Sequence, residues 1–375
     1  MKKIYLDNNA TTALDLRVIE AMQEVMTPLP FNASSVHSFG QESKKLLTQS
    51  RDTIAHALGV KPHELIFTSS GTEALNLLIR GLYVPGAHII SSNVEHPAVR
   101  ETLQSLEKQG AKVHYLPAGL WGAILPHQLE EALTPETHLI VLMAANNITG
   151  VKTDINSIAA IAHRRNIPFI VDGVQLLGKE SFHIPPGVSA MAFSGHKLHG
   201  PTGIGLAFVR SSYKLAPQIT GGSQENGRRA GTENLMGIVG LAKAIELLAT
   251  ELPAATPRMQ SLRDKLTEGL MHELGNVVVH GQGPRICNTV HIGFPGIDGE
   301  TLLLQLDLAG IAASHGSACT SGGLEPSPIL LNMQIPVSLA RTSIRFSLSR
   351  NTTEQEIDTA LELICQLIKK QKRLS

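Results

Sequence analysis

Short apolar runs alternate with amphipathic segments along residues 65–210 of the chain. The apolar runs have the length of buried strands, and most of the segments between them have the periodicity of helices. Continuous apolar strands that alternate with helices indicate a mostly parallel sheet covered on both faces. We expect strands at Leu65–Thr68, His88–Ser91, Val113–Leu116, Leu139–Met143, Pro168–Val171, Ala190–Phe193 and Gly205–Val209. We expect helices at Thr72–Leu82, Pro97–Gln109, Pro126–Leu133 and Ile155–Arg165, the last with Asp154 as its N-cap.

After Gly231 the pattern changes to long helices and isolated strands. A long helix is predicted from Glu233 to Glu251. The following Leu252–Pro257 stretch contains two prolines, which we expect to break the helix and form a hinge between two domains. The elements predicted beyond it are a helix at Met259–Leu274, strands near Val277–Val279, Thr289–Gly293 and Ser343–Ser347, and a closing helix at Glu354–Lys370. This order predicts a smaller α+β domain.

Composition narrows the class of protein. The 375 residues are 42% hydrophobic and 17% charged, with 32 basic and 32 acidic side chains, so no nucleic-acid or membrane partner is indicated. The best apolar run, Leu139–Ala145, is far shorter than a membrane span, and no signal-peptide pattern follows the first residues. The three cysteines, Cys287, Cys319 and Cys365, have no metal-ligand or disulfide spacing. We therefore expect a metal-free cytoplasmic enzyme.

Two predicted strands end in polar side chains that are rarely buried without a partner. The strand at residues 190–193 leads into Ser194-Gly195-His196-Lys197, and Phe169–Asp172 ends in a carboxylate. A lysine held in this way loses its proton readily and forms a Schiff base with an aldehyde. Because an aspartate keeps a pyridine nitrogen protonated, Lys197 and Asp172 together favour a pyridoxal phosphate site. For Lys197 alone, the alternative is a surface lysine in a turn.

Further polar residues follow other predicted strands. Thr72, His96 and Asn147 lie just beyond strand ends, as Asp172 and Lys197 do. In open α/β sheets, ligands bind outside the carboxyl edge of the strands. The Thr72 segment opens a helix, which favours an anion site, although a simple capped helix start has the same pattern. His96 is placed either to stack on a planar ring or to serve as a polar residue at a helix start.

Two positions in the last third of the chain suggest further chemistry. Cys319 lies in a loop of glycine, serine and alanine, where a thiol is accessible, although a loop cysteine without a role is the alternative. Arg345 is central in the predicted strand Ser343–Ser347. A buried arginine there requires an anion, which is either a substrate carboxylate or an internal carboxylate.

These motifs together resemble the cysteine desulfurases of the class V aminotransferase family. The segments that carry the resemblance are 5–12, 32–37, 67–73, 95–99, 171–175, 194–201, 221–225, 231–234, 316–321 and 343–347. The resemblance implies the fold-type I pyridoxal-phosphate scaffold, with a mostly parallel seven-stranded sheet in a large domain, residues 13–252. A small α+β domain of residues 1–12 and 253–375 would carry the Cys319 loop. The Ser-Ala-Cys-type loop resembles the group that serves iron–sulfur cluster assembly and tRNA thiolation.

The resemblance also implies the site. Lys197 would hold pyridoxal 5'-phosphate, Asp172 would pair with the pyridine nitrogen, and His96 would stack on the ring. The remaining cofactor residues implied are Gln175 on the ring hydroxyl, Gly71, Thr72, Ser194 and His196 on the phosphate, and Thr232 reaching the phosphate from the other subunit of a homodimer. The implied substrate and catalytic residues are Asn147 and Arg345 on the carboxylate of L-cysteine, Lys197 as base and Cys319 as nucleophile.

The implied reaction converts L-cysteine to L-alanine and leaves a persulfide on Cys319 for a protein acceptor, either a cluster scaffold or a thiolation enzyme. Alternatives are a selenocysteine lyase or aminotransferase on the same fold, or a catalytically weak sulfur-transfer scaffold. Two residues depart from the family pattern: Ile148 stands where the family commonly has Glu, and Ser349 where it has Gly. The chain also ends at Ser375, soon after the last helix, whereas some relatives have a longer tail that docks a cluster scaffold, so the resemblance leaves the choice of partner open.

Overall fold

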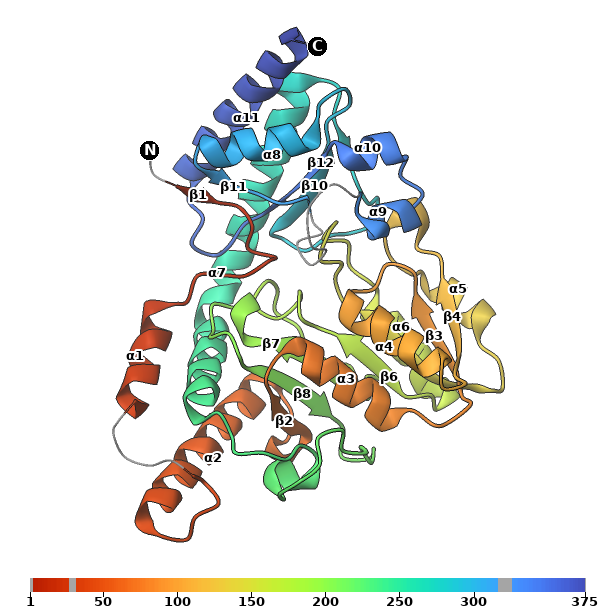
Figure 1. Ribbon diagram of the computed structural model, residues 1–375, viewed down its shortest axis with the longest axis vertical. Coiled ribbons are helices and arrows are strands. Elements are labelled where there is room, and N and C mark those ends of the chain that lie inside the picture. The colour runs from red at the N-terminus through yellow and green to blue at the C-terminus, as the bar shows by residue number, and fades with distance from the viewer. Residues whose placement is uncertain (1–2, 27–31, 316–325, 375) are drawn as a thin grey trace.

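The structure is a computed structural model that describes residues 3–26, 32–315 and 326–374. Within these residues the largest sheet has seven strands in the order β2-β8-β7-β6-β5-β3-β4 (Figure 1). Neighbouring strands are parallel except at β8, which is antiparallel to β2 and β7. The strands are β2 (Leu65–Thr68), β3 (His88–Ser92), β4 (Lys112–Leu116), β5 (Thr137–Met143), β6 (Phe169–Asp172), β7 (Ala190–Ser194) and β8 (Gly205–Val209).

Helices cover both faces of this sheet, because successive residues of a strand point to opposite faces. In β5, Ile140 and Leu142 pack in one core cluster with side chains of α2, α6 and α7. Their neighbours Leu139 and Val141 pack in a second cluster with α3 and α4, which lie across the front of the sheet in Figure 1. These helices are α2 (Ser38–Leu58), α3 (Gly71–Leu82), α4 (Pro97–Glu107), α6 (Ile155–Arg165) and α7 (Leu235–Leu274).

The predicted α/β class and the seven strands of the sheet are confirmed, and each strand and helix predicted between residues 65 and 210 is observed to within two residues. The Asp154 cap is also confirmed, because its carboxylate accepts a hydrogen bond from the Ser157 main-chain nitrogen at 3.1 Å. Helices α1 (Leu16–Val25) and α2 were not predicted. The shorter helices are α5 (Pro126–Ala132), α9 (Pro328–Asn332) and α10 (Val337–Arg341).

A smaller layer of strands lies above the large sheet in Figure 1. A three-stranded antiparallel sheet has the order β12-β10-β9, and β1 pairs with β11 in parallel. A third core cluster joins Ile4 and Leu6 near the N-terminus to side chains of α7, α8 and α11. The elements are β1 (Ile4–Tyr5), β9 (Val278–Val279), β10 (Thr289–Gly293), α8 (Gly299–Leu308), β11 (Ile311–Ala312), β12 (Ser343–Ser347) and α11 (Glu354–Leu374). The proposed domain boundary at residues 252 and 253 stays a prediction.

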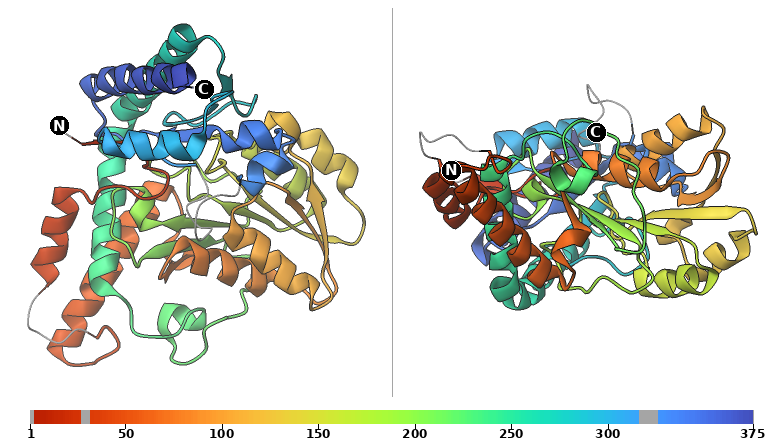
Figure 2. Two further views of the ribbon diagram at one scale, coloured as in Figure 1. Left: turned by 45° about the horizontal axis from the view of Figure 1, so that its top comes forward. Right: turned by 90° about the horizontal axis from the view of Figure 1, so that it is seen from below.

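The predicted break between two helices is wrong. Residues 235–274 form one continuous helix, α7, with Pro253 and Pro257 inside it. Each proline removes one main-chain hydrogen bond, at a cost of about 3 kcal/mol. Leu252, Ala255 and Met259 are buried along the same stretch, so tertiary packing offsets that cost. Figures 1 and 2 show α7 as a column that runs from the large sheet up to α8 and α11.

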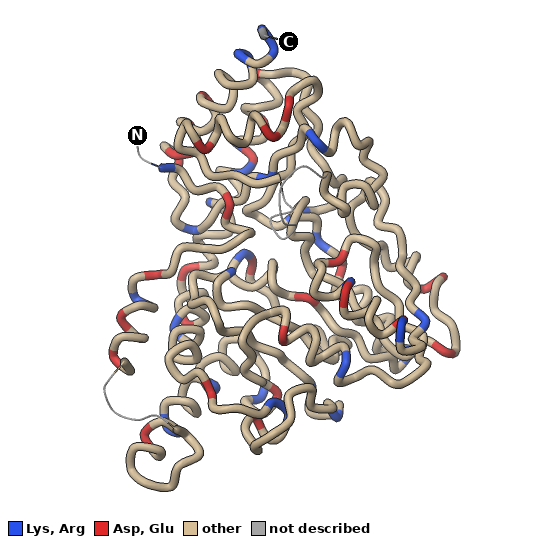
Figure 3. The backbone as a smooth tube through the Cα atoms, in the orientation of Figure 1, with Lys and Arg blue, Asp and Glu red and all other residues tan. Residues whose placement is uncertain are grey.

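Charged side chains of both signs are interspersed along the chain in Figure 3. This distribution agrees with the equal numbers of basic and acidic residues, 32 of each. Within the described part of the chain, no helix has the length and apolar character needed to cross a membrane.

Candidate active site

A cavity of about 260 Å³ lies beyond the carboxyl ends of the parallel strands. Residues from the large sheet, the N-terminal segment and β12 meet there, although they are far apart in the sequence. Ten of the twelve predicted site residues line it: Gly71, Thr72, His96, Asn147, Asp172, Gln175, Ser194, His196, Lys197 and Arg345.

Lys197 occupies a short 3₁₀ turn, Gly195–Lys197, directly after β7. Its amine donates hydrogen bonds to the main-chain oxygens of Asn9 at 2.5 Å and Ala10 at 2.7 Å. The N-terminal segment therefore lies against the lysine, and the Thr12 main-chain nitrogen donates to the His196 oxygen at 2.9 Å. Lys197 faces the cavity, so the alternative of a surface lysine in a turn is wrong.

Asp172 is the last residue of β6 and is buried. Burial raises the pKa of its carboxyl group. One carboxylate oxygen accepts a hydrogen bond from the Val174 main-chain nitrogen at 3.0 Å, which fixes the side chain in the cavity wall. The neighbouring carboxyl group of Glu95 is also buried, and burial raises its pKa to about 8.

His96 serves as the polar residue at a helix start, and its stacking on a ring stays a prediction. It is the N-cap of α4, because its Nδ1 accepts a hydrogen bond from the Ala98 main-chain nitrogen at 3.1 Å. It also lines the cavity. Burial lowers the pKa of its imidazole, against an opposing effect of the Asp172 carboxylate. Because Nδ1 accepts, the proton of the neutral ring lies on Nε2.

The N-terminus of α3 forms one wall of the cavity. Gly71 is the first helical residue, and Ser70 caps the helix by accepting from the Glu73 main-chain nitrogen at 3.1 Å. A Cβ atom on Gly71 would lie 2.8 Å from Val174 Cγ2 and 3.3 Å from Ser194 Cβ. A side chain at residue 71 would therefore crowd this wall of the cavity, and the N-terminus of a helix is a place where an anion can bind.

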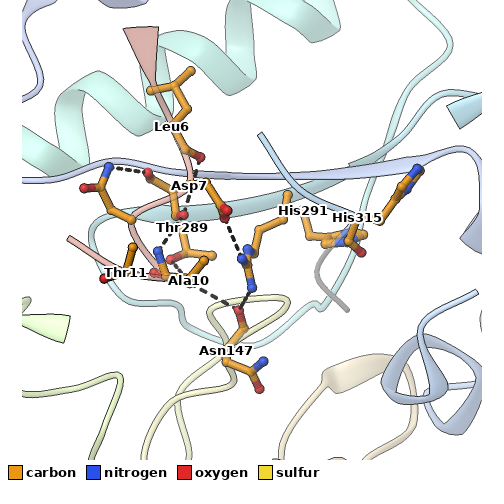
Figure 4. Close-up of polar contacts among 12 residues, drawn as sticks. Leu6, Asp7, Ala10, Thr11, Asn147, Thr289, His291 and His315 are labelled. Atoms are coloured by element: carbon orange, nitrogen blue, oxygen red, sulfur yellow. Dashed lines mark hydrogen bonds and ion pairs between the residues drawn. The ribbon is translucent and has the colours of Figure 1, made fainter. Parts of the chain in front are cut away.

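Arg345 and Asn147 meet on the side of the cavity nearest β12. Arg345 donates from Nη1 to the Asn147 main-chain oxygen at 2.9 Å and from Nη2 to Asp7 Oδ1 at 2.6 Å. Figure 4 shows Asp7 and Asn147 on opposite sides of the guanidinium group that both of them bind. The internal salt bridge considered for Arg345 is therefore present, while the arginine still lines the cavity.

Three cavity residues have buried polar atoms without a hydrogen-bond partner in the described part of the chain. They are Asn147 Oδ1, Gln175 Oε1 and Arg345 Nε. Each unsatisfied polar group costs about 1–3 kcal/mol. Two acceptors and one donor that are held in this way fit a polar ligand that supplies the missing bonds.

Two predicted site residues are not among the described residues that line this cavity. Thr232 is exposed on the loop before α7 and does not line the cavity of its own chain. Cys319 lies outside the described residues. The chain comes close to the site just before that segment, because the Arg345 main-chain nitrogen donates to the Ser314 oxygen at 2.6 Å.

Asp7, Asn9 and Ala10 come from the N-terminal segment, so a prediction based on polar residues at strand ends does not include them. This segment was part of the family resemblance, but none of its residues had been given a role. Glu95, next to His96, was also not predicted, because its sequence neighbours Ser92, Asn93 and His96 are polar and give no sign that it is buried.

Comparison with known proteins agrees with this arrangement. The Aminotransferase class-V family matches residues 4–360. Cysteine desulfurase 2 of Trichormus variabilis is 44% identical over 380 residues, which cover 100% of this chain and 95% of that protein. The chain therefore belongs to the class-V aminotransferase family, among the cysteine desulfurases.

Solved structures show the same likeness. A NifS-like protein has a TM-score of 0.90 at 34% identity, with 98% of this chain and 100% of that chain covered. A structure described as SspA in complex with cysteine has a TM-score of 0.83 at 30% identity, over 93% of this chain and 100% of that one.

Proposed function

We propose that the cavity binds pyridoxal 5'-phosphate and that the chain converts L-cysteine to L-alanine, leaving the sulfur as a persulfide on Cys319. The observation that carries the proposal is that the Lys197 amine and the buried Asp172 carboxyl group line one cavity. Relatives named cysteine desulfurase, and the related structure in complex with cysteine, support the choice of substrate. The reaction balances, because cysteine and one thiol contain the same atoms as alanine and one persulfide.

The cavity residues fit the ring of this cofactor. Lys197 offers an amine for its aldehyde, Asp172 a carboxylate for the pyridine nitrogen, and Gln175 an amide for the ring hydroxyl. His96 offers a flat face for stacking. The bound cofactor supplies an electron sink for the electrons released when the Cα–H bond of the substrate breaks.

The phosphate fits at the N-terminus of α3. Gly71 and Thr72, the first residues of α3, line the cavity together with Ser194 and His196. Burial is the main cause that lowers the pKa of His196 to about 4, so the ring is neutral and acts as a hydrogen-bond partner. Thr232 would complete the site from a second copy of the chain, and its exposed position supports a homodimer.

The remaining residues act on the substrate. Arg345 and Asn147 bind and orient its carboxylate: Arg345 has an unused donor, Nε, at the cavity, and Asn147 would donate from its side-chain amide nitrogen. Lys197 accepts the Cα proton on Nζ and returns a proton later as alanine forms. The Cys319 thiolate attacks the substrate sulfur, so the S–S bond forms while the C–S bond breaks.

The persulfide would pass to a protein acceptor, either a cluster scaffold or a tRNA-thiolation enzyme. The support for this step is the resemblance of the Cys319 loop to that group of desulfurases. The expected cytoplasmic location stays a prediction based on cysteine usage.

The test is an assay of purified protein with L-cysteine and a reductant, in which alanine and sulfide should appear in equal amounts. Cys319→Ala should lose both products by at least about a hundredfold, while Cys365→Ala, a control at a buried cysteine of α11, should keep them. Retained desulfuration in Cys319→Ala would overturn the nucleophile assignment.

The same variant separates the alternative functions. A selenocysteine lyase or an aminotransferase would turn over without Cys319, so activity of Cys319→Ala on selenocysteine would favour the lyase. A protein that stays colourless with added cofactor would favour a catalytically weak sulfur-transfer scaffold.

A further inference from the structure

Lys179 is a fully buried lysine that the proposed reaction does not use. It follows β6 and is 2% exposed. Its amine donates a hydrogen bond to the main-chain oxygen of Lys197 at 2.8 Å. A lysine is almost never fully buried unless it is paired or has a chemical function. The partner here is the main chain of the residue that lines the cavity with its own amine.

The main chain of Lys179 is held in place from two other directions. Its carbonyl oxygen accepts hydrogen bonds from Thr256 Oγ1 of α7 at 2.8 Å and from Cys287 Sγ at 3.1 Å. The preceding Gly178 has a φ of +85°, and a Cβ there would lie 2.8 Å from Leu198 Cβ. Lys179 therefore connects α7 and the segment before β10 to the turn that carries Lys197.

The charged groups around the Lys179 amine are mainly cationic. Burial is the main cause that lowers the pKa of Lys179 to about 8. Cys287 opposes this change, whereas the positive charges of Lys197 and Arg350 lower the pKa further. His196 and His199 lie near as neutral rings, because burial mainly lowers the pKa of each to about 4.

The nearest carboxylates are already paired with other cations. Asp15 pairs with Arg350 at 2.6 Å, and Glu180 pairs with Lys152 at 2.9 Å. The carboxyl group that interacts with Lys197 itself is Asp172, so Asp172 and Lys179 act on the Lys197 amine in opposite directions.

We propose that Lys179 is a positioning residue for Lys197: its amine fixes the Lys197 main chain, and its positive charge favours the neutral form of the Lys197 amine. Two amines that share a buried region disfavour each other's protonation. Only a neutral amine bonds to an aldehyde or accepts a proton. The inference rests on the proposed function, because it assigns those two tasks to Lys197.

The test compares Lys179→Met, Lys179→Arg and a control, Lys112→Met at an exposed lysine of β4, as full-length cofactor-free protein. Acetic anhydride labels neutral amines, and mass spectrometry of the peptide with residue 197 measures the labelling rate. Without the repulsion from Lys179, the pKa of the Lys197 amine should rise by roughly one unit. Lys179→Met should therefore lower the labelling rate at pH 7 about tenfold. Lys179→Arg and the control should stay within about twofold of the parent protein.

A second pH separates the effect of charge from a change in shape. At pH 11 the rates should converge, because nearly every lysine is then neutral. Equal rates at pH 7 in Lys179→Met and the parent protein, or a difference that persists at pH 11, would overturn the proposal. Should Lys179→Met fail to fold, Lys179→Gln, which keeps a donor but lacks the charge, carries the same expectation.

The proposed function is tested separately on the parent protein. Borohydride should fix added pyridoxal phosphate to Lys197. If it does not, the proposed function fails, while the labelling comparison still decides whether Lys179 controls the state of the Lys197 amine.

Discussion

The buried carboxyl group of Glu95 should make the protein less stable as the pH rises. Its Oε1 accepts hydrogen bonds from Ser92 Oγ at 2.5 Å and from the Met143 main-chain nitrogen at 3.2 Å. Oε2 is buried without a partner in the described residues. Burial, together with the nearby Asp172 charge, raises the pKa of Glu95 from 4.5 to about 8. Glu95 therefore keeps its proton at neutral pH in the folded protein and loses it in the unfolded chain.

The sign and size of the effect follow from this difference. Between pH 4.5 and about 8 the unfolded chain binds fewer protons than the folded protein, so rising pH favours unfolding. The slope is at most about 1.4 kcal/mol per pH unit, which amounts to about 2–4 kcal/mol between pH 5 and pH 8. Glu95→Gln keeps the shape of the side chain and removes the titrating proton.

Urea unfolding of the cofactor-free protein at several pH values measures this effect. The difference in unfolding free energy between the parent protein and Glu95→Gln should change in favour of the variant by about 2–4 kcal/mol from pH 5 to pH 8. The exposed Glu131→Gln on α5 is the matched control and should run parallel to the parent. Parallel curves for Glu95→Gln and the parent protein would refute the reasoning.

Three further predictions concern other parts of the fold. Gly71→Ala places a methyl group in a cavity wall that has no room for it, so the cofactor dissociation constant, measured by absorbance titration, should rise at least about tenfold; unchanged affinity would contradict the phosphate assignment. Glu225→Gln weakens a buried pair with Arg51, at 2.5 Å, and should lower the unfolding free energy by about 3 kcal/mol in urea, whereas Glu130→Gln, in a surface pair, should cost less than about 1 kcal/mol. Ile148→Glu puts a carboxyl group at a position that is 1% exposed, beside Asn147, the asparagine proposed to bind the substrate. Turnover or acceptor preference should therefore change in steady-state assays. Unaltered kinetics and an unaltered acceptor range would contradict this prediction.

Local pattern predicted the large sheet well, since each buried strand is a short apolar run between turns. It failed at Pro253 and Pro257, where a helix that proline normally breaks continues through packing of Leu252 and Met259. The tendency of proline to break a helix is a property of the isolated segment. In the folded protein, the burial of neighbouring side chains offsets the hydrogen bonds that the prolines remove.

The residues of the candidate site likewise include some that the local pattern predicted and some that it did not. Lys197, Asp172 and His96 follow strands, so the parallel topology alone brings them to one edge. Asp7, Asn9 and Ala10 come from a segment near the N-terminus that folds back onto this edge. Such contacts depend on how distant segments pack, and no local periodicity records them.

The sequence by itself determined the alternating strands and helices, the family resemblance and the strand-end residues, because each of these depends on local pattern or on motifs. Only the tertiary structure decided that Lys179 lies beneath Lys197, that Asp7 pairs with Arg345 and that α7 is unbroken. The physical reason is that burial and distance between side chains are properties of the packed chain. The proposed roles of Lys197 and Cys319 rest on sequence motifs, and the proposed effect of Lys179 on Lys197 rests on the tertiary structure.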